Sequence, residues 1–209
     1  MRMKTAKIKV TIYVLLGLVL SIQTARLVIQ VRQKRIALAH HQAKCKGNPR
    51  ASLKIVEYTD FQCPACAKGM KVLKEYGLYY PERFYVEYKH FPLEMHPKAM
   101  SIAIAAECAA QQKKFWPFHD LAFERQNLLR ESINLFDRLK EIAGATGLNQ
   151  QVFDRCLEDP KIKEAISREI DEGRRLKVGA TPTYFINEKM VVGGNSLKQE
   201  LEKAVGKLP

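Results

Sequence analysis

The first 50 residues of this 209-residue chain contain no aspartate and no glutamate. They hold 11 of its 35 lysines and arginines, so residues 51–209 carry 24 basic against 22 acidic residues, a net charge of only +2. This near-neutral balance argues against a basic nucleic-acid-binding domain as the source of the overall charge of +13. We therefore expect a basic N-terminal arm that meets a membrane surface, and no nucleic-acid partner.

Apolar stretches long enough to cross a bilayer are also scarce. The run Val10–Ile22 has 13 uncharged residues after four basic side chains, which suits a signal-peptide core and is short for a full span. Extending it through Val31 reaches spanning length but includes Arg26. We predict that residues 1–31 are an uncleaved signal-anchor, with a cleaved signal peptide as the alternative.

Residues 32–50 show neither a strand period nor a helix period and end in Gly-Asn-Pro, so we expect a basic, solvated tether. His40 and His41 lie near Cys45, which raises the alternative of a metal site. We favour the tether because no fourth ligand follows at zinc-site spacing. Cys45 is then either an isolated thiol or an intermolecular link.

Strand and helix patterns in residues 51–209 predict an α/β domain. β-Branched and aromatic runs indicate four strands, and helical patterns flank or separate them. The order β-α-β, a helical block, then β-β-α fits a four-stranded mixed sheet with a helical insertion. The expected strands are 52–59, 84–89, 182–187 and 189–192. The expected helices are 64–76, several within the insertion at about 97–177, and one from Ser196 to about Lys207. One insertion helix is expected at 132–147, with Ile133 on its apolar face.

The motif Cys63-Pro64-Ala65-Cys66 follows the first predicted strand and opens a helix. Two cysteines three residues apart on one turn can close a disulfide with little backbone movement. The first sulfur lies at the helix N-terminus, where backbone N–H groups and the helix dipole favour the reactive thiolate. We predict Cys63 as nucleophile and Cys66 as the more buried resolving partner. The alternative is a four-thiolate zinc site with Cys108 and Cys156, but these two are not spaced as a paired motif.

Three segments carry a resemblance in the same order along the chain: IVEYTDFQCPAC, AAECAAQQKKFWPFHDLAF and VGATPTYFINEKMVVGG. Together they resemble the DsbA-type thiol:disulfide oxidoreductases of the thioredoxin superfamily over about residues 48–208. The resemblance implies a thioredoxin-like fold with an inserted helical domain. It also implies a cis peptide bond at Thr181-Pro182, with the Thr181 backbone presented to an extended substrate.

The resemblance implies roles for four further residues. Glu57 corresponds to a buried acid that exchanges a proton with Cys66, and Lys89 to a nearby basic partner; the alternative is a surface charge pair. Cys108 and Cys156 correspond to cysteines that often form a disulfide across the insertion, whereas two buried thiols are the other possibility.

Several features of the sequence bear on the direction of the chemistry and on substrate contacts. The strongest oxidants of the family have histidine where Ala65 stands, so we expect a milder oxidant. The aromatic run 115–119, which includes His119, is assigned to packing. Phe61, Phe91 and Pro92 either receive unfolded substrate or pack in the core.

The leading hypothesis is an exported enzyme that forms disulfides in reduced client proteins outside the cytoplasm, in a bacterial periplasm or cell envelope. It needs no cofactor or metal, and its reoxidation calls for a membrane partner of the DsbB or vitamin-K-epoxide-reductase type. The alternatives are a reductase or isomerase fed by a membrane electron donor, and a membrane-anchored binding module without catalysis.

Overall fold

The computed structural model describes residues 17–32, residue 38 and residues 41–206, and the chain divides into two units, 1–41 and 42–209. Residues 17–32 are helical. Within the described residues, no helix is both long enough and apolar enough to cross a bilayer. Much of the proposed signal-anchor, including residues 10–16, lies outside the described part of the chain, so the anchor stays a prediction.

The second unit is built on a five-stranded mixed sheet with the strand order β1-β3-β2-β4-β5. Strand β2 runs parallel to β3, as the β-α-β pattern predicts, and the other neighbours are antiparallel. The strands are β1 (Cys45–Gly47), β2 (Leu53–Thr59), β3 (Phe84–His90), β4 (Thr183–Ile186) and β5 (Lys189–Val192).

The strand β1 corrects our expectation that residues 32–50 are a tether without regular structure. Cys45, Lys46 and Gly47 pair with β3 at the edge of the sheet, which adds a fifth strand to the four predicted. Three residues are too few to show the alternation of a strand, and the pairing partner supplies the hydrogen bonds that hold them extended. The folded unit therefore begins before residue 51.

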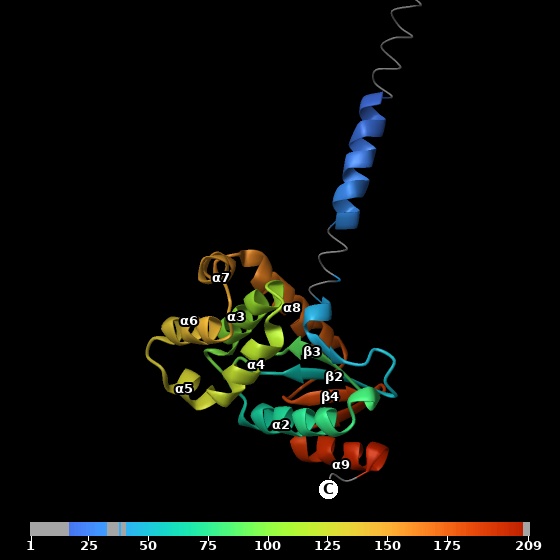
Figure 1. Ribbon diagram of the computed structural model, residues 1–209, viewed down its shortest axis with the longest axis vertical. Helices are drawn as coiled ribbons and strands as arrows, with labels where there is room; N and C mark the ends of the chain where they lie inside the picture. The colour runs from blue at the N-terminus through green and yellow to red at the C-terminus, as the bar shows by residue number, and fades with distance from the viewer. Residues whose placement is uncertain (1–16, 33–37, 39–40, 207–209) are drawn as a thin grey trace, which may run out of the picture. The chain divides into compact units, whose positions relative to one another are not determined.

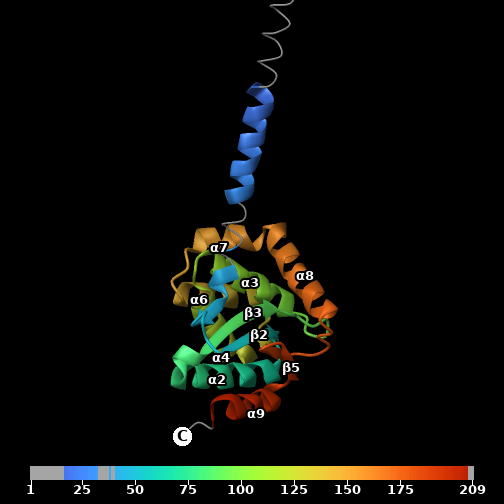
Figure 2. The same ribbon diagram turned by 90° about the vertical axis from the view of Figure 1, so that its right-hand side faces the viewer.

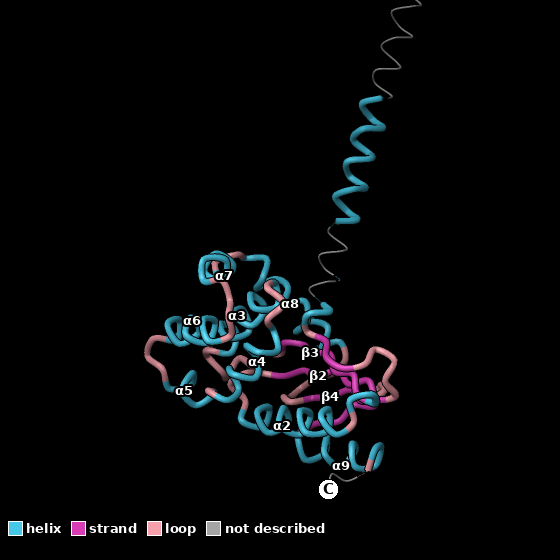
Figure 3. Tube along the Cα trace, in the orientation of Figure 1, coloured by secondary structure: helices cyan, strands magenta, loops and turns pink. Residues whose placement is uncertain are grey.

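Helices enclose this sheet, which is gathered into one part of the domain between α2 and α8 (Figure 3). In two perpendicular views α2 and α9 lie side by side at one end, while α3, α6 and α7 lie toward the other (Figures 1 and 2). The helices are α2 (Pro64–Tyr79), α3 (Ala99–Gln111), α4 (Phe115–Glu124), α5 (Gln126–Glu131), α6 (Leu135–Ala145), α7 (Gln150–Leu157), α8 (Pro160–Arg175) and α9 (Gly194–Val205), with a short 3-10 turn at Pro81–Arg83.

Capping residues explain where these helices start and where our predictions fail. Asp159 accepts a hydrogen bond from Lys161 N and precedes Pro160, which fits the first helical position. Asn134 caps α6, so Ile133 is in the preceding loop and fully exposed instead of lying on the predicted apolar face. Helix α9 starts at Gly194, before the predicted cap Ser196.

Burial of the aromatic side chains decides between substrate contact and packing near the Cys63 loop. Phe61 is 1% exposed and Phe91 is 6% exposed. Phe61 packs 4.9 Å, centroid to centroid, from Phe123, and His119 is buried in the same aromatic cluster. These rings therefore stabilise the core and do not form an open apolar surface.

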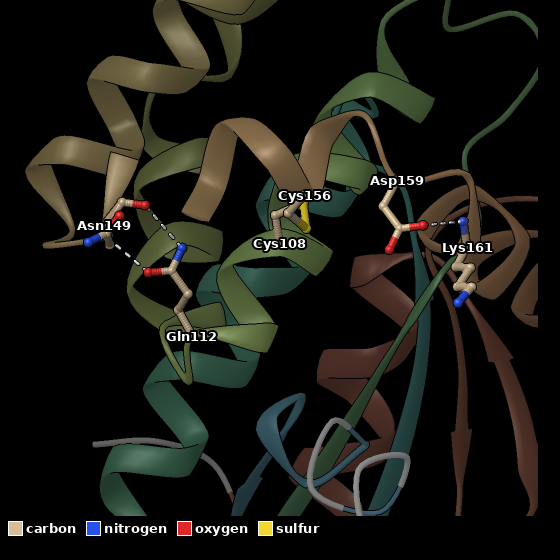
Figure 4. The surroundings of a disulfide bond; sticks show 6 residues. All are labelled: Cys108, Gln112, Asn149, Cys156, Asp159 and Lys161. Atoms are coloured by element: carbon tan, nitrogen blue, oxygen red, sulfur yellow. Dashed lines mark hydrogen bonds between the residues drawn. A yellow bond between two sulfur atoms is a disulfide. The ribbon is translucent and has the colours of Figure 1, made fainter. Parts of the chain in front are cut away.

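A disulfide joins the insertion helices α3 and α7 through Cys108 and Cys156 (Figure 4). Beside it, the side chain of Gln112 accepts a hydrogen bond from Asn149 N at 2.9 Å and donates one to Asn149 O at 3.3 Å. Since the two cysteines bond to each other, the four-thiolate zinc alternative is not formed. In the chain-entropy description, closing a loop between residues 48 apart stabilises the fold by about 4 kcal/mol.

A buried ion cluster fixes the segment that leads into β1. The Lys44 ammonium contacts Glu107 of α3 and Glu169 of α8, and the Glu107 carboxylate lies 3.0 Å from His90 Nε2. Burial alone would lower the pKa of Lys44, but the two carboxylates raise it, so the ammonium stays charged. Our tether prediction missed this contact because the partners are 63 and 125 residues away in the sequence.

We expect Lys44→Met to destabilise the domain by about 3–5 kcal/mol at neutral pH, because it leaves the buried Glu107 carboxylate and the part-buried Glu169 carboxylate without the ammonium. Urea unfolding checks this value, and the loss shrinks in acid as the carboxylates bind protons. The matched control is Lys46→Met, two residues away and exposed, for which we expect less than about 1 kcal/mol. Equal effects of the two substitutions would contradict the assignment.

Candidate active site

The two cysteines of the motif occupy the first turn of α2. Cys63 is the residue that precedes Pro64 at the helix start and is 7% exposed, whereas Cys66 is fully buried one turn later. Cys66 N donates to Cys63 O at 3.0 Å, which closes this turn. In this reduced state the first sulfur is therefore the one that an incoming group meets, as the sequence predicts.

Side chains from distant segments hold the loop before Cys63 in place. Gln126 of α5 donates to the carbonyl oxygens of Phe61 and Cys63, at 2.8 and 2.9 Å. Asp60 accepts hydrogen bonds from Gln62 N, Leu93 N and His96 Nδ1, all within 2.8 Å. These contacts hold the loop and the Cys63 backbone in one conformation without any bound molecule.

Electrostatics at α2 favour the anion of Cys63. A hydrogen bond from the Cys66 thiol is the largest cause, and the Thr181 side chain and backbone N–H groups at the helix start add to it. Burial opposes the shift, and the net effect lowers the pKa of Cys63 to about 5. Cys63 is therefore a thiolate at neutral pH and both a nucleophile and a good leaving group.

Cys66 has the opposite character. Burial raises the pKa of Cys66 well above its usual range, and the hydrogen bond to Cys63 raises it further. The nearby Thr59 hydroxyl opposes this in part. One proton is thus kept on Cys66 and shared with the Cys63 sulfur, which is the arrangement that a resolving cysteine needs.

The loop before β4 faces the reactive sulfur. The Thr181-Pro182 peptide bond is cis, and Cys63 Sγ lies 3.3 Å from Thr181 O. Behind Pro182, the hydroxyl of Tyr184 approaches α2 so closely that a Cβ on Gly69 would lie 1.9 Å from it. The absence of a side chain at Gly69 therefore lets α2 pack against the buried Tyr184 of β4, a role that the sequence analysis did not identify.

Glu57 is buried on the face of β2 that α2 covers. It lies opposite Tyr88 of β3 and Tyr184 of β4, and its Oε1 atom is buried without a protein partner. Burial raises the pKa of Glu57 to about 8, although the Thr59 hydroxyl lowers it in part. Since Thr59 acts on both Glu57 and Cys66, the carboxyl group sits in the surroundings of the resolving thiol.

Lys89 is on the other side of the sheet. Side chains alternate along β3, so Tyr88 shares the face of Glu57 and Lys89 does not. Its ammonium lies 2.9 Å from Glu87 and 3.2 Å from Glu172 of α8. The structure therefore does not bring Lys89 to Glu57 or to the cysteines, because the register of the strand places it among surface carboxylates.

Asp60, Gln62 and Gln126 are site residues that sequence analysis missed. Gln62 accepts a hydrogen bond from Lys98 N at 2.6 Å and ties the cysteine loop to the start of α3. A polar pair directly before the motif was the available signal, because buried polar side chains in a loop usually bond to its backbone. Nothing in the sequence marks Gln126, which reaches the loop from 63 residues away.

A family model and several solved structures are similar to this domain. A family model described as thioredoxin matches residues 41–207. Among solved structures, the chain is similar to α-DsbA1 of Wolbachia pipientis (TM-score 0.66, 23% identity, 77% of this chain and 89% of that one) and to oxidised BdbD of Bacillus subtilis (0.65, 20%, 77% and 91%). At identities this low, the TM-scores show a shared fold.

The curated relatives are longer proteins. The chain is 34% identical over 143 residues to a Na⁺/H⁺ antiporter NhaA of Salinispora tropica, and 32% identical over 147 residues to one of Mycolicibacterium gilvum. These matches cover 68% and 69% of this chain but 21% and 23% of the relatives, so it spans about a fifth of their length.

Because the hydrogen bond from the Cys66 thiol is the main cause of the lowered pKa of Cys63, replacing Cys66 should raise that pKa. In Cys66→Ala the pKa of Cys63 rises toward the ordinary thiol value near 8.5, whereas Cys66→Ser keeps an O–H donor and retains most of the shift. Iodoacetamide labelling of the Cys63 peptide, followed by mass spectrometry across pH 4–10, measures both, with reduced wild type titrating at about 5. Identical profiles for the two variants would refute this cause.

The raised pKa of Glu57 makes stability depend on pH. Its folded pKa of about 8 lies above the unfolded value of 4.5, so the folded state favours the protonated form and loses stability as pH rises from 4.5 to 8. We expect the free energy of unfolding of the wild type to fall by an amount on the order of 4 kcal/mol between pH 4 and pH 9. Glu57→Gln should not show this fall, and urea unfolding across the pH range measures both proteins. Glu75→Gln, an exposed change on α2, serves as the control and leaves the profile unchanged.

Proposed function

The chain belongs to the thioredoxin family, and from this premise we propose that it is an exported thiol:disulfide oxidoreductase that forms disulfides in extracytoplasmic proteins. The observation that supports this most is the pair of sulfurs at α2, one favoured as an anion and the other as a thiol. A stabilised Cys63 thiolate favours the reduced form of the pair, so the disulfide form tends to take electrons from substrates.

The proposed reaction starts from the Cys63–Cys66 disulfide. A substrate thiolate attacks Cys63 Sγ, the bond to Cys66 breaks, and the Cys66 sulfur leaves and takes a proton for which Glu57 is the proposed donor. A second substrate thiolate then attacks the substrate sulfur of this mixed disulfide and releases the Cys63 thiolate. The substrate loses two electrons and gains a disulfide, and the enzyme keeps both electrons as a dithiol.

The loop at Thr181-Pro182 is the proposed docking site for the substrate chain. Thr181 is part-exposed and its backbone faces Cys63, so an extended segment can pair with it as an added strand. Backbone pairing is insensitive to side chains, which suits an enzyme with many client proteins.

Reoxidation needs an electron acceptor, and we propose a membrane partner of the DsbB or vitamin-K-epoxide-reductase type. The N-terminal segment, in which basic residues precede an apolar run, supports this proposal. An anchor or a membrane-surface contact there would keep the domain near such a partner. The proposed location is the bacterial periplasm or cell envelope.

A reductase or isomerase is the second candidate, and Ala65 is the observation that favours it. Alanine offers the Cys63 thiolate no positive charge, so the pair is a weaker oxidant than one with histidine at that position. A non-catalytic binding module is the third candidate, and it requires that the sulfurs do no chemistry.

Activity assays on the full chain separate these candidates. We expect the oxidised protein to accelerate oxidative refolding of a reduced, unfolded protein, with a redox potential more reducing than about −120 mV. Cys63→Ala abolishes the activity because the attacked sulfur is gone. Strong reduction of insulin without oxidation would instead establish the second candidate, and unchanged activity of Cys63→Ala would exclude thiol chemistry.

A further inference from the structure

A cavity of about 300 Å³ lies among α2, α4 and the β1–β3 edge of the sheet. Its wall is mainly apolar and includes Met70 and Leu73 of α2, Phe84 of β3 and Trp116 of α4. Apolar cavities of about 150 Å³ can hold one benzene molecule, so this one has room for two fused rings.

Two buried polar side chains line the same cavity, Glu57 and His119. Glu57 is 1% exposed and His119 is 2% exposed at the side chain. Oε1 of Glu57 and Nε2 of His119 each lack a protein partner within hydrogen-bonding distance. Burying such atoms costs free energy, and a ligand that bonds to them recovers it.

Charge and hydrogen bonding define what each group offers. Burial lowers the pKa of His119, so the ring is neutral at pH 7, and its Nδ1 lies 2.9 Å from Asp120 Oδ1. Burial would raise the pKa of Asp120, but the bond to His119 lowers it to about 2, so this carboxylate only accepts. Nδ1 therefore donates, which leaves Nε2 as an acceptor, while protonated Glu57 offers a donor.

We propose that this cavity is a binding site for a small aromatic alcohol of about two fused rings, whose hydroxyl donates to His119 Nε2 while its rings fill the apolar part between α2 and α4. A hydroxyl also accepts, so it matches protonated Glu57 as well. Lys74 and Asp120, 3.3 Å apart, lie at the more exposed part of the lining.

The site goes beyond the proposed function, because binding there does not require disulfide exchange. It touches that function at one residue, since Glu57 is the group to which we assign proton exchange with Cys66. The test below measures occupancy without any thiol reaction, so its failure and the failure of the proposed function are distinguishable.

The only tryptophan of the chain lines the cavity and reports on it. The indole Nε1–H of Trp116 donates to Cys45 O at 3.1 Å. In NMR spectra of the ¹⁵N-tryptophan-labelled full chain, the indole N–H resonance therefore reports on the cavity. We expect a saturable shift on titration with 2-naphthol, and about tenfold weaker binding of 2-methoxynaphthalene, which keeps the rings but has no hydrogen to donate. No saturable shift, or equal affinities, would overturn the proposal.

Two variants of the full chain test the contacts. His119→Phe removes the acceptor at similar size, so naphthol binding falls about tenfold while the methyl ether is little affected. Gly77 also lines the cavity, and a Cβ there meets nothing within 4 Å, so we expect the phenyl group of Gly77→Phe to occupy this space and to abolish binding of both probes. Lys71→Phe, on the exposed side of α2, is the control and binds normally. Wild-type affinity in Gly77→Phe would overturn the site even if His119→Phe failed to fold.

Discussion

The sharing of one proton between two sulfurs at the start of α2 is the constraint on which the rest of the site depends. Cys66 keeps the proton because it is buried, and it gives a hydrogen bond to Cys63, which lies where the helix offers N–H groups. The surrounding structure maintains this difference in environment. Gln126 and Asp60 fix the loop before the motif, and the absence of a side chain at Gly69 lets α2 pack against Tyr184 of β4.

Much of the fold was predictable because its signals are local. The four longer strands alternate or contain β-branched and aromatic residues, the parallel β2–β3 pair follows from the β-α-β order, and Pro64 and Pro160 mark helix starts. Strand β1 was not predictable in this way. Its three residues are extended because β3 is beside them, and no pattern in so short a segment distinguishes a strand from a loop.

The site was predictable to the extent that the motif and the resemblance define it, and the rest needed the register of the sheet. Strand alternation gives two sets of residues but does not say which set faces α2. The structure puts Glu57 on that face and Lys89 on the opposite one, among the carboxylates of Glu87 and Glu172. Lys44 is a similar case, since a lysine in a basic segment gives no sign of partners on α3 and α8.

The position of Lys44 also has a mechanical consequence. Any tension carried along the chain from residues 1–41 would reach the domain around Lys44, since Ala43 packs against the core and Lys44 leads into β1. Its two ion pairs connect the entry point to both α3 and α8, and β1 connects it to the edge of the sheet. A pull on this segment would therefore be shared among α3, α8 and the edge of the sheet, none of which contains Cys63 or Cys66.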